Sequence, residues 1–203
     1  MPHLPRTLAA LPVFPLPDYY LLPGVVAPLH VFETRYRQMM EDLMDGPGRL
    51  VLTPFRTETP RIERGPVLGD LGTLAEIVQH EQLEDGRWVM IVAALGRVAI
   101  EEVESKRLYR KVDAVLVPDA DPEGVDAGGL RTRLVAALHQ RAEGPWEAPA
   151  GTSIGRLADL LLHALALDRE HQAQAYGELD PLARAELALQ RHDQVPLQSE
   201  GEA

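Results

Sequence analysis

The spacing of apolar residues changes along the chain, from short runs typical of strands to spacings typical of helices. Residues 11–14 and 25–31 are apolar runs that contain proline, which predicts strands at a sheet edge because proline cannot donate to a strand ladder. Leu22-Pro23-Gly24 predicts a turn just before the second run. Residues 50–52 form a further β-prone run. These segments predict short strands joined by turns.

One helix is expected among these strands. Apolar residues recur at helical spacing, and Asp45-Gly46-Pro47-Gly48 then stops the pattern. The apolar positions are Phe32, Tyr36, Met39, Met40 and Leu43. The two methionines are compatible with an adaptable binding surface, but methionine at this spacing more often fills a core. We therefore interpret the segment as an amphipathic helix that packs through its apolar stripe.

The middle of the chain predicts longer strands. Residues 73–83 and 87–95 flank Glu84-Asp85-Gly86, and an Asp-Gly pair tolerates the positive φ of a tight hairpin turn. Gly96-Arg97 is expected to turn the chain into a further strand at residues 98–100. An antiparallel meander of this length with few helices suggests a closed or nearly closed barrel, which removes exposed sheet edges.

A change of composition marks a boundary after Val117. Residues 118–124 are polar, acidic and rich in proline, and the sequence beyond them has helical spacing. Helices are expected at residues 126–143, 153–167, 168–176 and 180–191. The chain is thus predicted to be an α+β protein: a β-barrel unit at 9–117 that is an antiparallel meander with one helix, a linker at 118–125, and a C-terminal helical bundle at 126–195.

Composition narrows the possible environments. The chain has 203 residues, 45% of them hydrophobic, which suits a folded globular protein and no membrane span. It contains no cysteine, so disulfides, thiolate metal sites and a cysteine nucleophile are excluded. Acidic residues outnumber basic ones by 31 to 20, and the formal charge of −11 disfavours nucleic acid as a partner. No signal-peptide pattern opens the chain, so we expect a cytoplasmic protein.

A search for catalytic motifs finds none. Neither lysine, Lys106 or Lys111, follows a glycine in a phosphate-binding loop, and no serine lies in a Gly-x-Ser-x-Gly elbow. His80 and Glu81 lack a second histidine at the spacing of a zinc peptidase, and Leu130 stands where a calcium loop around Gly124 would need its glutamate. We therefore expect no cofactor, no metal and no enzymatic activity. A hydrolase assembled from residues far apart in sequence remains an alternative.

Several blocks of the sequence carry a family resemblance. They are residues 11–16, Leu22-Pro23-Gly24, residues 28–37, 71–78, 83–87 and Gly96-Arg97-Val98. In order and spacing they resemble the N-terminal substrate-recognition domain of the ATP-dependent Lon protease, most of all the free-standing bacterial proteins that consist of this domain. The resemblance is strong over residues 9–117 and weaker in the helices that follow.

This resemblance implies a PUA-like β-barrel followed by helices. It also implies a non-catalytic module that recognises unfolded or degron-bearing protein segments, or that serves a protease or chaperone partner as an adaptor in protein quality control. The ATPase module and the Ser-Lys protease domain of Lon have no counterpart in this sequence, so proteolysis is not implied. Cereblon shares a related domain used for docking, and weak self-association is left open.

A binding surface for an extended peptide requires exposed apolar residues or an open strand edge. The most apolar loop in the barrel half is Tyr19, Tyr20, Leu21 and Leu22, which we take as the candidate peptide-binding segment; the alternative is that it packs onto the fold. The residues shared with the family motif are expected to be structural. They are Pro23, Gly24, Pro28, Phe32, Glu33, Arg35, Tyr36, Gly72, Asp85 and Gly86.

RNA binding is the second function that we considered, because PUA-like barrels elsewhere bind RNA. A basic stripe would be needed to overcome the net negative charge. The candidates for it are Arg56, Arg61, Arg64, Arg107, Arg110 and Lys111.

Overall fold

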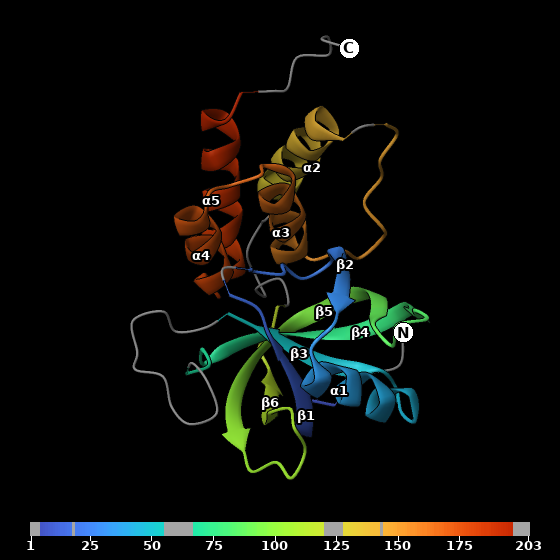
Figure 1. Ribbon diagram of the computed structural model, residues 1–203. Coiled ribbons are helices and arrows are strands. Elements are labelled where there is room, and N and C mark those ends of the chain that lie inside the picture. Colours follow the sequence, from blue (N-terminus) through green and yellow to red (C-terminus); the bar gives the residue numbers. More distant parts are fainter. Residues whose placement is uncertain (1–4, 18, 55–66, 120–127, 143, 197–203) are drawn as a thin grey trace. The chain divides into compact units, whose positions relative to one another are not determined.

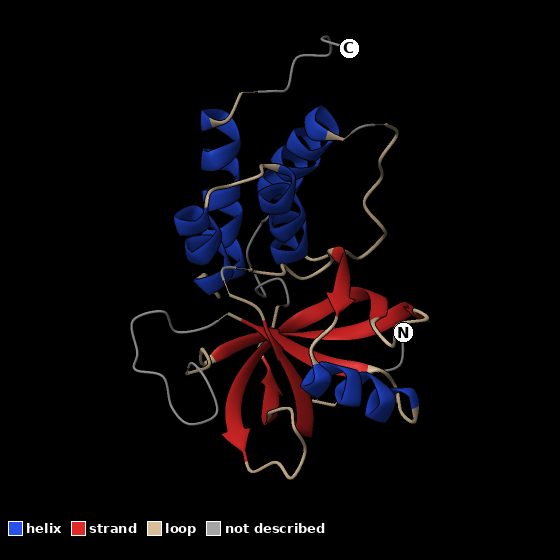
Figure 2. Cartoon of the chain, viewed as in Figure 1, coloured by secondary structure: helices blue, strands red, loops and turns tan. Residues whose placement is uncertain are grey.

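The chain divides into two compact units, Met1–Val117 and Pro118–Ala203. The computed structural model describes residues 5–17, 19–54, 67–119, 128–142 and 144–196 (Figure 1). Among the described residues, the first unit holds the strands and one helix, and the second unit is helical (Figure 2). The predicted α+β class is therefore confirmed. Most of the expected linker at 118–125 lies outside the described residues.

Six strands form one sheet in the first unit. They are β1 (Thr7–Pro15), β2 (Val26–Val31), β3 (Arg49–Thr53), β4 (Leu71–Gln82), β5 (Trp88–Val103) and β6 (Lys111–Leu116). Their order is β2-β5-β4-β3-β1-β6, and β5 also pairs with β6. The pairings of β1, β3, β4, β5 and β6 therefore form a circuit, while β2 is attached to β5 alone among the described strands.

Strand β5 links two halves of this sheet. Its first part pairs with β2, from Val31↔Trp88 to Val26↔Ala93, and its second part pairs with β6, from Val98↔Leu116 to Val103↔Lys111. The turn predicted at Gly96-Arg97 is wrong, because β5 runs through both residues. A glycine weakens a strand in isolation, but here the strand is continued by its pairing with β4 on both sides of Gly96.

The expectation of edge strands for both proline-containing runs is confirmed for β2 and wrong for β1. Strand β1 lies between β3, to which it is parallel, and β6. The N–H of Val13 donates to Arg110, so successive N–H groups alternate between the two neighbours. By this alternation, an N–H at Pro12 would face β3, but the pairing between β1 and β3 begins only at Val13. An N–H at Pro15 would face β6, but the pairing between β1 and β6 has already ended at Pro12. The prolines thus cost no ladder bond.

The two predicted turns are present. The Val25 N–H donates to the Leu22 carbonyl at 3.2 Å, with Pro23 and Gly24 at the central positions and Gly24 at φ +92°, a turn that requires glycine. At the hairpin, the Leu83 N–H donates to Arg87 at 2.8 Å, and Gly86 has φ +79°. The hairpin between β4 and β5 is therefore confirmed.

Helix α1 (Thr34–Met44) packs through Tyr36, Met39, Met40 and Leu43, as its apolar spacing predicts. Phe32 is the exception: it precedes the helix, and its side chain is 60% exposed. The prediction that Phe32 belongs to the apolar stripe of this helix is wrong. Elsewhere in the unit a core cluster lies between the strands, made of Val13, Val51, Leu68, Leu74, Val98, Val112 and Ala114.

The second unit contains α2 (Gly128–Arg141), α3 (Ile154–Ala164), α4 (Arg169–Gly177) and α5 (Pro181–Gln194). Three of these helices begin where the sequence places a capping residue. Ser153, Asp168 and Asp180 each accept a hydrogen bond from a main-chain N–H in the first turn. Pro181 stands at the first turn of α5, where a missing N–H has no cost. The four predicted helices are therefore confirmed, with shifted ends.

Candidate functional site

The candidate segment Tyr19–Leu22 is only partly accessible. Leu21 and Leu22 are buried, whereas Tyr19 is 38% exposed. The Leu21 carbonyl accepts a 2.7 Å hydrogen bond from the hydroxyl of Thr73, which fixes the segment against β4. Only the tyrosine end of this segment can therefore touch a partner without rearrangement of the core.

A second exposed feature follows immediately in sequence. Side chains alternate along β2, so that Val26, Pro28 and His30 are exposed while Ala27 and Val31 are buried. Val26 is 56% exposed, and Phe32 continues the exposed series just past the end of the strand. We call the exposed set Tyr19, Val26, Pro28, His30 and Phe32 the β2 surface.

The main chain of β2 is also open on one edge. The Val25 carbonyl accepts from the N–H of Ala94 at 2.9 Å, so by alternation Ala27, Leu29 and Val31 face β5. The peptide groups of Val26, Pro28 and His30 then point to the opposite edge. In the part of the chain that the structure describes, no strand pairs with that edge. The β2 surface thus combines apolar side chains with a free strand edge.

The residues of the family motif mostly have structural surroundings. Glu33 precedes α1, and its carbonyl accepts from the N–H of Tyr36 and Arg37. Tyr36 is buried, packs edge-on against the ring of Phe14 at 4.5 Å, and lies under the guanidinium of Arg35 at 4.6 Å. Burial raises the pKa of Tyr36 to about 12. This phenol therefore stays protonated and acts as a packing group.

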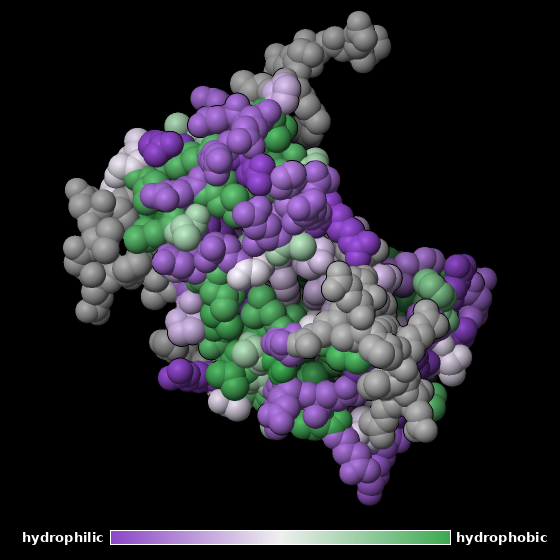
Figure 3. Space-filling model, turned by 90° about the vertical axis from the view of Figure 1, so that its left-hand side faces the viewer, coloured by the Kyte–Doolittle hydropathy of each residue, from purple (hydrophilic) through white to green (hydrophobic). Residues whose placement is uncertain are grey.

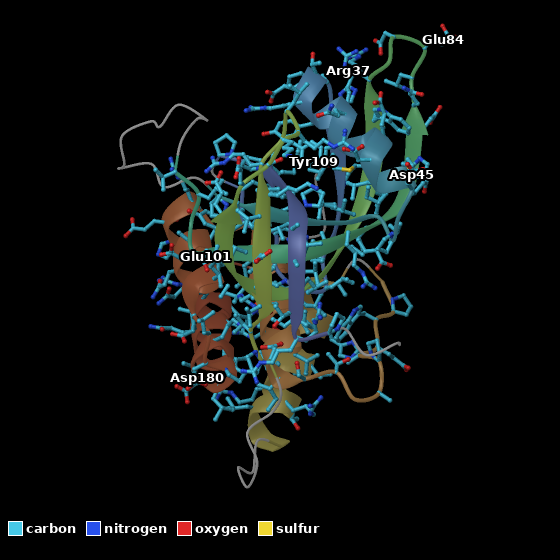
Figure 4. All side chains as sticks on the ribbon, turned by 90° about the horizontal axis from the view of Figure 1, so that it is seen from below. Arg37, Asp45, Glu84, Glu101, Tyr109 and Asp180 are labelled. Atoms are coloured by element: carbon cyan, nitrogen blue, oxygen red, sulfur yellow. The ribbon has the colours of Figure 1, made fainter. Side chains whose placement is uncertain are left out.

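The Arg35 side chain pairs with the Glu33 carboxylate at 2.7 Å on the surface. Gly72 lies on β4 beside β3. An added Cβ at this position would lie 2.5 Å from Cγ1 of Val51 on β3, so only glycine fits there. Asp85 accepts from the N–H of Arg87 and holds the hairpin turn. Figure 4 shows the adjacent Glu84 at the tip of this hairpin, directed away from the body of the unit.

A polar cleft of about 360 Å³ lies between α1 and the connection from β5 to β6, and the sequence did not predict it. It is lined by Pro12, Asp42, Asp45, Arg107, Tyr109 and Lys111. Tyr109 and Asp45 are labelled in Figure 4. The Tyr109 hydroxyl donates to Asp42 at 2.7 Å, and Arg107 pairs with the same carboxylate at 3.1 Å. Burial raises the pKa of Tyr109. The acids and bases of this cleft largely compensate one another.

This pairing bears on the basic stripe considered for RNA. Arg56, Arg61 and Arg64 lie outside the described residues. Arg110 is buried and its Nε donates to Glu102 at 2.8 Å, while Arg107 is engaged by Asp42. Two of the three described residues of the stripe are thus paired with carboxylates, which reduces the positive charge available to a phosphate backbone.

The described residues contain no group of three or more His, Asp or Glu side chains arranged to hold a metal ion. The two described serines are engaged elsewhere: Ser105 donates to the carbonyl of Tyr109, and Ser153 caps α3. Within the described ranges, no helix combines the length and hydropathy needed to cross a bilayer. On the face of the first unit shown in Figure 3, apolar side chains gather in one area that polar side chains border.

Comparison with known proteins gives a consistent family signal. A model of the ATP-dependent protease La (LON) substrate-binding domain matches residues 10–191. The Lon protease of Desulforamulus reducens is 25% identical over 190 residues, which cover 88% of this chain and 23% of that protein. Lon protease 2 of Myxococcus xanthus is 28% identical over 193 residues, covering 89% and 23%. The chain thus spans about a quarter of the length of these relatives.

Two solved structures share the fold. The crystal structure of a Lon N-terminal domain protein from Xanthomonas campestris superposes with a TM-score of 0.65 at 24% identity, covering 90% of this chain and 98% of that one. The N-terminal domain of Mycobacterium avium complex Lon protease superposes with a TM-score of 0.64 at 19% identity, covering 91% and 98%.

Proposed function

Because the chain belongs to the ATP-dependent protease La (LON) substrate-binding domain family, we propose that it is a non-enzymatic module that binds unfolded protein segments through the β2 surface. One observation carries the choice of surface. Six large apolar side chains are exposed among the described residues of the first unit, and three of them, Tyr19, Val26 and Phe32, lie within fourteen residues of one another. Exposed apolar residues next to a polar rim are typical of protein-binding sites.

The energetics favour weak, reversible binding. Burial of an apolar side chain contributes about 25 cal/mol per Å², so two or three half-exposed side chains provide a few kcal/mol at most. A module that samples many unfolded clients requires such modest affinity, because tight binding would hold the client. The surroundings of Leu21 and Leu22 limit the contact to Tyr19 and the residues of β2 and its end.

We also propose how the chain is divided into a barrel, a linker and a helical unit. We infer a PUA-like barrel at residues 9–117, supported by the circuit of pairings from β1 through β6. A linker at 118–125 and a helical unit at 126–195 complete the domain plan. An adaptor role in quality control, with a protease or chaperone partner in the cytoplasm, fits a client-binding module and is part of this proposal.

The direct test compares an unfolded and a folded form of one protein. Reduced and alkylated ribonuclease A is the unfolded probe, and native ribonuclease A is its control. We expect the chain to bind the unfolded form only. The double variant Val26→Ser, Phe32→Ser should weaken binding about tenfold. The control variant Leu108→Ser, Val115→Ser, which removes apolar residues exposed elsewhere, should bind within about twofold of the parent.

Either of two results would contradict the proposal. One is equal binding of native and unfolded ribonuclease A. The other is a larger loss from the Leu108→Ser, Val115→Ser control than from the β2 variant.

A further inference from the structure

The free edge of β2 has an unusual pattern of donors and acceptors. Val26 and His30 each direct an N–H and a carbonyl outward, whereas Pro28 between them offers a carbonyl alone. The described residues show no hydrogen bond to these outward groups. The edge therefore presents two donors and three acceptors over five residues.

We propose that β2 binds client segments as an added strand, with the client main chain pairing to Val26, Pro28 and His30. This inference rests on the proposed function and specifies how the client is held. Strand addition recognises the main chain, so it suits unfolded clients of unrelated sequence, while side-chain contacts set preference.

The flanking side chains, more than the net charge, define the preferred occupant. Val26 and Phe32 stand at the two ends of the edge, six residues apart, which is roughly 20 Å along an extended chain. An extended segment of about six residues spans this distance. The first unit, which carries β2, holds 16 acidic and 13 basic residues, so its charge disfavours an acidic segment only weakly and the apolar residues at both ends set the main preference.

Pro28 fits this role because it suppresses the competing occupant, a second copy of the chain. In an antiparallel pair of two β2 strands centred on Pro28, each proline ring would face the position where a donor is required. Proline on an open edge is a common protection against self-pairing. A client strand loses one bond at this position, but Val26 and His30 still supply both of their groups.

The test uses a labelled peptide, Lys-Thr-Val-Thr-Val-Thr-Val-Lys, and two N-methylated isomers. One isomer is methylated at every threonine and the other at every valine, so that each loses the donors of one edge. We expect the parent peptide to bind, one isomer to lose about tenfold or more in affinity, and the other to bind within about twofold. Side-chain binding alone predicts no difference between the isomers.

A matched pair of protein variants tests the β2 edge itself. His30→Pro removes the outward N–H without removing a bond to β5, and His30→Ala removes the side chain while keeping the N–H. We expect His30→Pro to bind the parent peptide about three- to tenfold more weakly than His30→Ala. The peptide isomers decide the question if His30→Pro fails to fold.

The outcomes separate the two proposals. Binding of the parent peptide with equal affinity for both isomers, and equal affinity of the two His30 variants, would overturn strand addition and leave client binding standing. Failure of both the parent peptide and unfolded ribonuclease A to bind would overturn client binding itself.

Discussion

The hydroxyl of Thr73 donates a 2.7 Å hydrogen bond to the carbonyl of Leu21, and both residues are buried. This bond ties the segment before β2 to the start of strand β4. Thr73→Val would leave the Leu21 carbonyl without this donor, so we expect a loss of about 1–3 kcal/mol in unfolding free energy. Amide exchange at residues 19–22 should also rise. Thr73→Ser, which keeps the hydroxyl, serves as control, and equal exchange in both variants would contradict the anchoring role.

In the second unit, Arg184 is almost fully buried and its Nε lies 3.1 Å from Oδ1 of the buried Asp159. Arg184 also pairs with Asp119 and donates to the Glu178 carbonyl. Asp159→Ala removes one of the two carboxylates that compensate Arg184 and leaves the pair with Asp119, so it should cost about 1–3 kcal/mol. The exposed pair Arg87–Asp85 provides the control, and Arg87→Ala should cost less than about 1 kcal/mol.

Tryptophan fluorescence can follow this loss in the correct unit. The chain has two tryptophans, Trp88 in the first unit and Trp146 in the second. Urea unfolding in a Trp88→Phe background therefore reports on the helical unit, and unfolding in a Trp146→Phe background reports on the Arg87→Ala control in the first unit. A cost for Asp159→Ala no greater than that for Arg87→Ala would show that the buried pair does not stabilise this unit.

The end of α5 depends on the protonation of His192. Arg141 Nε donates to His192 Nδ1 at 2.9 Å, and Gln140 Oε1 lies 3.1 Å from Nε2, which fixes the neutral ring with its proton on Nε2. Burial and the Arg141 charge lower the pKa of His192 below its usual 6.5, although Asp193 opposes this. The unfolded chain therefore binds the proton first as the pH falls. Stability should be full above pH 6.5 and decrease as the pH falls through the folded pKa.

The measurement is the difference in unfolding free energy between pH 7.5 and 5.5. His192→Asn retains an acceptor near the position of Nδ1 but does not titrate, so its stability should fall less over this range than that of the parent. The same fall in both proteins would rule out His192 as the responsible group.

Pro28 should keep the chain from pairing with itself. Pro28→Val restores an outward donor at the centre of the β2 edge, giving three consecutive donor positions. We expect concentration-dependent self-association of this variant in sedimentation velocity, reversed when Val26→Pro is added. Identical sedimentation of Pro28→Val and the parent at all concentrations would show that Pro28 has no such role.

Local chemistry explains why much of the fold was predictable. The Asp85-Gly86 turn, the Pro23-Gly24 turn and the helix starts at Ser153 and Asp180 depend on residues close in sequence, and all are present. Helix spacing likewise placed Tyr36 in the core. Each of these features is set by dihedral preference or by a capping bond over a few residues.

The incorrect predictions concern features decided by distant partners. Gly96 reads as a turn, but β4 continues to pair with β5 on both sides of it. The placement of β1 in the interior of the sheet depends on a parallel pairing with β3, which no local signal announces. Phe32 shares the helical spacing of α1 yet precedes the helix, so its exposure became visible only in three dimensions.

The sequence predicted the candidate site only in part, because its accessible surface also depends on contacts between distant residues. Composition drew attention to Tyr19–Leu22, but the bond from Thr73 and the burial of both leucines shift the accessible surface toward β2. The free edge of β2 is a property of strand order, and the polar cleft near Tyr109 joins residues from three segments of the chain. Pro28 had indicated an edge strand in advance, whereas the cleft has no sequence signature.

Amide chemical-shift mapping with unfolded ribonuclease A can show directly whether clients bind at the β2 surface. The ¹⁵N-labelled chain would be titrated with the reduced, alkylated protein and each amide followed. We expect shifts concentrated at Tyr19 and along residues 26–32, with His30 among the largest, and little change near Tyr109. Shifts centred on the Tyr109 cleft or on the second unit, with β2 unmoved, would contradict binding at the β2 surface.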